Sequence, residues 1–121
     1  MESPVQTNFR ITLERLRNEI DDTQAVLLAG PEGVIDYILV DPTLNIETVA
    51  GEYAMLLRIA GRTTEDTGAG NLVEQIVVSE RSIMIARSIS PQHFLILLCR
   101  TQDQVGRARY EMKQAAREIQ I

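Results

Sequence analysis

The chain has 121 residues, of which 45% are hydrophobic and 24% charged, so it can bury a core and lacks the composition of a disordered protein. Lys and Arg number 12 against 17 Asp and Glu, and the net charge of -5 disfavours nucleic acid as a partner, because phosphate binding depends on clustered cations. We expect one domain over residues 1–121, with residues 1–6 as a flexible tail.

The cellular location is indicated by what the sequence lacks. A single cysteine, Cys99, excludes an internal disulfide and is typical of a reducing compartment. The first residues have neither the basic start nor the apolar stretch of a signal peptide. The longest apolar runs, such as 94–99, are far shorter than the ~20 residues that span a bilayer. We therefore expect a soluble cytoplasmic protein without direct membrane insertion.

The first third of the chain predicts a helix followed by a β-hairpin. Apolar residues recur at helical spacing over about 8–20, and Thr7 or Asn8 is expected to cap the start of this helix. Two apolar runs, 25–29 and 34–40, then flank a turn rich in Gly and Pro. Such a pair of runs is typical of two antiparallel strands.

The rest of the chain predicts a long helix, three strands and a last helix. The expected ranges are 45–62 for the long helix, with Thr43 or Asn45 opening it, 72–79, 82–89 and 94–100 for the strands, and 104–119 for the last helix. Residues 63–70 are rich in Thr and Gly and are expected to form a loop. Short polar connectors favour an antiparallel meander. Strands that are apolar throughout indicate a sheet that is covered on both faces. We expect two of the helices on one face and the third on the other.

Several of these features together resemble the Roadblock (dynein light-chain) domain family over about residues 7–120. They are the element order, the hairpin 26–34, the central helix ending in Ala60, the small-residue loop 68–72, and the strand 94–98 leading into 105–109 and Ala115-Ala116. The resemblance rests on the order and spacing of these features, because no single one of them is diagnostic of the family. It implies an α+β sandwich, α-β-β-α-β-β-β-α, with a five-stranded antiparallel sheet and helices on both faces.

The resemblance also implies how such a domain works. Members of the family form homodimers in which the third strands pair edge to edge and the central helices lie side by side. The residues that this places on the dimer strand are Leu72, Glu74, Ile76 and Val78. Bacterial MglB-type members bind a Ras-like small GTPase and accelerate its GTP hydrolysis, and other members are adaptor subunits of larger complexes. The chain is thus expected to be a binding module and not an enzyme.

The central helix carries apolar residues on two sides at about 100° per residue. The side expected to face the sheet comprises Ile46, Val49, Ala50, Tyr53, Leu56, Leu57 and Ala60. The opposite side carries Met55 and Ile59, one turn apart, beside Gly51. Scattered apolar residues on a surface are common, but this combination of two large apolar residues and a glycine favours an interface. The predicted partner or dimer surface therefore comprises Gly51, Glu52, Met55, Arg58, Ile59 and Arg62.

The sequence offers no convincing catalytic or metal-binding set. His93 and Cys99 cannot supply the four ligands of a structural metal site, and Cys99 lies in an apolar run where thiols are usually inert. We expect His93 on the surface beside a turn, Cys99 in the core, and no cofactor. Two alternative functions stay open. One is a structural adaptor that does not affect hydrolysis, and the other is a small-molecule sensing domain, which requires a polar pocket.

Overall fold

The structure is a computed structural model that describes residues 4–119. Its elements are α1 (Pro4–Glu19), β1 (Thr23–Gly30), β2 (Gly33–Leu39), α2 (Ile46–Asp66), β3 (Glu74–Val78), β4 (Ile83–Ser90), β5 (His93–Cys99), a short 3-10 turn η1 (Gln102–Gln104) and α3 (Val105–Glu118). The order of helices and strands confirms the predicted α-β-β-α-β-β-β-α arrangement.

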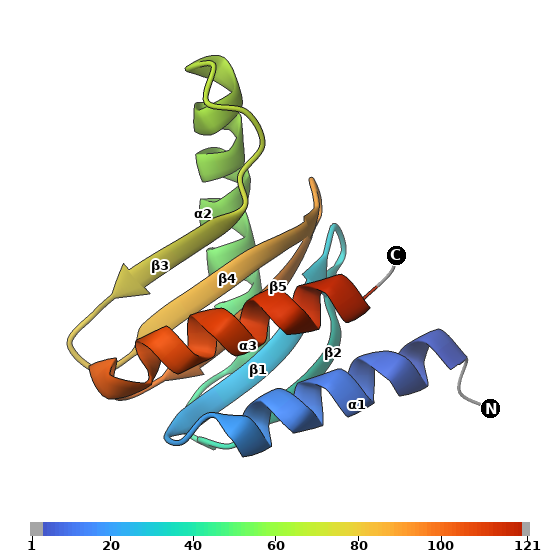
Figure 1. The fold of residues 1–121 in the computed structure, drawn as a ribbon, viewed down its shortest axis with the longest axis vertical. Helices are drawn as coiled ribbons and strands as arrows, with labels where there is room; N and C mark the ends of the chain where they lie inside the picture. The colour runs from blue at the N-terminus through green and yellow to red at the C-terminus, as the bar shows by residue number, and fades with distance from the viewer. Residues whose placement is uncertain (1–3, 120–121) are drawn as a thin grey trace.

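The five strands form one antiparallel sheet in the order β2-β1-β5-β4-β3. Figure 1 shows α1 and α3 on one face of this sheet and α2 on the other, and the second half of α2 extends beyond the ends of the strands. The predicted meander of the last three strands and the division of helices between the faces are both confirmed. Because β5 is central, β2 and β3 are the two edge strands.

The two faces of the sheet bury side chains of different size. Beneath α1 and α3 the core is made mostly of large residues such as Leu16, Ile85 and Leu97. Beneath α2 it contains a set of alanines, namely Ala25, Ala29, Ala50 and Ala54. Small side chains on both the helix and the strand allow α2 to lie close to β1. Alanines therefore contribute to the packing of α2 on the sheet, beside larger residues such as Leu57 and Phe94.

The first helix begins earlier than expected. Because Pro4 is its first residue, Thr7 and Asn8 lie inside α1, and the prediction that either of them caps the helix was wrong. Proline is well tolerated at a first helical position, where its missing N–H would have no partner within the helix. Of the expected flexible tail, residues 1–3 lie outside the described residues, and 4–6 belong to the helix.

The start of α2 was predicted correctly and its end was not. Asn45 caps the helix by accepting a hydrogen bond from the N–H of Thr48 (3.0 Å). The helix then continues to Asp66, through four residues that were expected to belong to a loop. One of these residues, Thr63, donates its hydroxyl hydrogen bond to the Ile59 carbonyl one turn earlier (2.9 Å). This local bond gives a threonine hydroxyl a partner within a helix.

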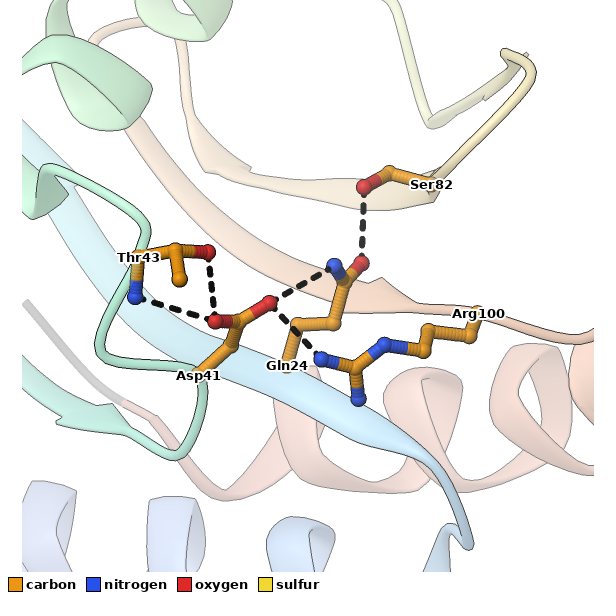
Figure 2. A network of polar contacts seen from close by, with 5 residues as sticks. All are labelled: Gln24, Asp41, Thr43, Ser82 and Arg100. Carbon is orange, nitrogen blue, oxygen red and sulfur yellow. Dashed lines mark hydrogen bonds and ion pairs between the residues drawn. The ribbon is translucent and has the colours of Figure 1, made fainter.

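A polar network joins four strand ends at one side of the sheet (Figure 2). One oxygen of Asp41 accepts bonds from the N–H (3.0 Å) and hydroxyl (2.6 Å) of Thr43. The other accepts from Arg100 Nη2 (2.7 Å) and Gln24 Nε2 (3.4 Å). Gln24 is buried, and its Oε1 accepts from the Ser82 hydroxyl (2.7 Å). The network thus connects the start of β1, the residues after β2, the start of β4 and the end of β5.

This network predicts a specific loss of stability in acid. Hydrogen bonds from Thr43, and more weakly the contacts with Gln24 and Arg100, hold the pKa of Asp41 below its ordinary value of 3.8. A depressed carboxyl pKa stabilises the fold above the unfolded pKa and loses that contribution as pH falls through the folded one. We therefore expect the Tm of Asp41→Asn to depend less on pH than that of the wild type between about pH 6 and about pH 3.

The matched control for this prediction is Asp21→Asn, which removes an exposed carboxylate outside the network. Thermal unfolding of this variant, followed by circular dichroism across the same pH range, should show the same acid dependence as the wild type. If the Tm of Asp41→Asn falls as much as that of the wild type over this pH range, the ionisation of Asp41 makes no contribution to stability through the network.

Candidate partner surface

The outer side of α2 carries an exposed apolar ridge, formed by Met55, Leu56 and Ile59. Met55 and Ile59 are 51% and 59% exposed, as expected for the residues predicted to face away from the sheet. Leu56 is 37% exposed, so its predicted place on the buried side was wrong. The α2 ridge is therefore broader than the sequence indicated, with three large apolar side chains in contact with solvent.

The buried side of α2 is narrower than predicted. Its buried residues are Ala50, Ala54 and Leu57, while Val49 and Tyr53 are half-buried against the same core. Ala54 was not among the residues expected to face the sheet. The helix sits close to β1 through its alanines, so the buried arc is centred on these small residues and Leu56 is left outside it.

The glycine of the predicted surface is not required by packing within the chain. Gly51 is exposed, and a Cβ placed on it would meet no atom within 4 Å. A glycine in the interior of a helix costs ~1 kcal/mol relative to alanine. A glycine at position 51 leaves room for a second helix to pack closely against α2. Glu52, the next residue, is likewise exposed.

The two predicted arginines have different surroundings. Arg58 donates from Nη2 to the Gly30 carbonyl at the β1–β2 turn (3.1 Å), which holds its guanidinium near the sheet. Arg62 lies 3.9 Å from Asp66, and both side chains are largely exposed. An exposed pair of this kind contributes little to stability. Arg62 is therefore the freer of the two cations to meet an acidic group on a partner.

The edge strand β3 is held to the rest of the chain by ion pairs, and an exposed apolar residue lies at or next to each of its ends. Glu74 binds Arg87 on β4 (3.0 Å) and Arg109 on α3 (2.6 Å). Val73, just before the strand, and Val78, its last residue, are both well exposed. Within the part of the chain that the structure describes, β3 pairs only with β4, so its outer edge is available to another strand.

Two other residues predicted for the dimer strand lie against opposite faces of the core. Ile76 packs against the core beneath α1 and α3, whereas Leu72 packs against the core beneath α2. Leu72 also precedes β3, which is shorter than the expected 72–79 and spans Glu74–Val78. Of the four residues predicted for the dimer strand, Glu74, Ile76 and Val78 therefore lie on β3 and Leu72 lies outside it.

The residues considered for chemistry are placed as follows. Cys99 is fully buried, as predicted, and burial raises the pKa of its thiol, which opposes reactivity. His93 is the first residue of β5 and is half-buried, with Nδ1 2.7 Å from the Ser90 hydroxyl. Among residues 4–119, the His, Cys, Asp and Glu side chains form no group of three or more suited to a metal ion.

None of the helices described combines the length and apolarity needed to cross a bilayer.

Comparison of the whole fold identifies similar solved structures. MglB from Myxococcus xanthus matches with a TM-score of 0.85 at 16% identity, covering 98% of this chain and 89% of that one. MglC from the same organism matches with a TM-score of 0.65 at 28% identity, covering 93% and 96%. The Roadblock/LC7 domain from Streptomyces avermitilis matches with a TM-score of 0.75 at 17% identity, covering 90% and 92%.

Comparison of the sequence alone finds no matching family model and no matching curated protein. The family resemblance therefore rests on the order and spacing of elements and on the solved structures. MglB and the Streptomyces domain place the same helices and strands in the same arrangement, despite their low identity. This chain has the Roadblock fold, as its sequence predicted.

Proposed function

We propose that this chain forms a homodimer, through β3 and α2, that binds a Ras-like small GTPase in the cytoplasm and regulates its GTP hydrolysis. The observation that carries the proposal is the α2 ridge, Met55, Leu56 and Ile59, exposed on a helix whose other side already packs on the sheet. Large apolar side chains gathered on one face are typical of an interaction site. The Roadblock fold supports the choice of partner, because the family resemblance implies GTPase binding.

The proposed mechanism is a shift of population and not a chemical step. In this mechanism the GTPase supplies the catalytic groups. By binding one conformation of the GTPase switch segments more tightly than the other, the dimer biases the GTPase toward the geometry in which its own groups hydrolyse GTP. Such a role requires a stable dimer, and Glu52 and Arg62 supply a polar rim beside the apolar α2 ridge through which the dimer would form.

The test is a binding experiment resolved by nucleotide state. Ras-like small GTPases from the same genome are loaded with GDP or with a non-hydrolysable GTP analogue and titrated with this protein. Their GTP hydrolysis rates are then measured with and without it. We expect tighter binding to the GTP-like state and a changed hydrolysis rate. Equal binding in both states with an unchanged rate would favour the structural adaptor, and no binding in either state would contradict the proposal.

A further inference from the structure

A pocket of about 440 Å³ lies between the second half of α2 and the turn that joins β4 to β5. Leu57 and Phe94, which are buried, form part of its lining together with the half-buried Leu72. Small-molecule sites commonly have volumes of ~300–1,000 Å³ and a mostly apolar lining with a few polar groups. The pocket has a volume in this range, and its lining combines apolar residues with several polar and charged ones.

One wall of the pocket carries an excess of positive charge. Arg58 and Arg62 line it from α2, and Glu65 is the one carboxylate among the lining residues. The bond from Arg58 to the Gly30 carbonyl holds its guanidinium in place through one nitrogen and leaves further N–H donors for a ligand. Arg62 also lies 3.9 Å from Asp66, but both side chains are largely exposed, so this weak pair leaves the Arg62 guanidinium available to a ligand.

The other walls supply neutral hydrogen-bonding groups. Ser88 and Ser90 line it from the β4–β5 hairpin, and Asn71 lines it from the segment before β3. The Ser90 hydroxyl is also in contact with Nδ1 of His93 (2.7 Å), which fixes its position. Hydroxyl and amide groups can donate to the oxygens of an anion beside the two guanidinium groups.

We propose that this pocket binds a small amphiphilic anion. Its apolar body lies against Leu72 and Phe94, and its phosphate or carboxylate group is bound by Arg58 and Arg62. Guanidinium groups are permanently charged and offer paired N–H donors that match the oxygens of either anion. The site goes beyond the regulation of a GTPase, because all of its lining residues belong to one copy of this chain, and Arg58 and Arg62 place it beside the predicted partner surface.

The experiment is an NMR titration of the ¹⁵N-labelled full chain, without any GTPase, so that its outcome is independent of the proposed partner. Phenyl phosphate and phenylacetate are the two anionic probes, and benzyl alcohol is their neutral counterpart. We expect saturable shifts of the amides of Gly61, Asn71 and Ser88 with at least one anion, and binding of benzyl alcohol at least ~10-fold weaker. The tighter of the two anions identifies the head group.

The double variant Arg58→Ala, Arg62→Ala should bind the same anion at least ~10-fold more weakly. Its own spectrum reports whether it is folded. The matched control Arg81→Ala, Arg117→Ala removes two exposed arginines outside the pocket and should bind like the wild type. Absence of saturable shifts up to about 10 mM of either anion, or equal binding by the Arg58, Arg62 variant, would overturn the proposal.

Discussion

Replacing Ile85 by alanine is expected to lower the free energy of unfolding by about 2–5 kcal/mol. Ile85 is fully buried on β4, where it pairs with Ile76 on β3 and Leu97 on β5 and packs beneath α1 and α3. Alanine at this position would leave a cavity in a core that cannot collapse easily, because its neighbours are held by strand pairing on both sides. For a domain of this size the Tm should fall by roughly 3–5 °C per kcal/mol.

The matched control is Ile11→Ala, which makes the same chemical change at an exposed position on α1. Substitutions at such surface positions usually change stability by less than about 0.5 kcal/mol. Urea unfolding of both variants, followed by circular dichroism, gives the comparison directly. Equal losses at the two positions would contradict the placement of β4 inside the sheet and of α1 on its surface.

The arrangement of the core could be predicted from sequence because it depends on long apolar runs. The run from Phe94 to Cys99 has no polar residue to expose, so it fits a central strand covered on both faces, as β5 is. The hairpin of β1 and β2 followed in the same way from two apolar runs around a glycine- and proline-rich turn. These signals are local and strong, and no competing interaction overrides them.

The partner surface could be predicted only in part, because periodicity locates a helix face but not how far it is buried. Met55 and Ile59 lie opposite the sheet, as their spacing indicated. Leu56 falls just outside the buried arc, whereas Ala54 lies within it. Alanine carries a weak signal in a pattern of apolar residues, so neither position could be assigned from the pattern alone.

The pocket and the length of α2 depend on tertiary geometry that the sequence does not encode locally. The four residues after Arg62 in α2 include two threonines, which have low helix propensity, yet the helix continues through them to Asp66. This added turn carries Glu65 to the pocket, opposite the β4–β5 turn. Residues from three separate segments meet there only because α2 extends past the strands, as Figure 1 shows.

The double substitution Met55→Asp, Ile59→Asp is expected to weaken self-association by at least ~100-fold, and with it the GTPase binding that depends on the dimer. Each change would place a charge in an interface that excludes water, and a central interface residue commonly contributes about 2 kcal/mol or more. Two such losses amount to about 4 kcal/mol, and each 1.4 kcal/mol corresponds to about tenfold in affinity. Sedimentation velocity would report the dimer, and the nucleotide-resolved titration would report the partner.

The control is Ile11→Asp, Tyr110→Asp, which introduces two charges at equally exposed apolar positions on α1 and α3, across the sheet from α2. This variant matches the change in net charge and starts from side chains of similar exposure, so it tests the effect of position. It should associate and bind as the wild type does. The α2 ridge differs from other exposed apolar residues only if the two double variants behave differently. Unchanged association and binding in the Met55, Ile59 variant would remove the observation on which the proposed function rests.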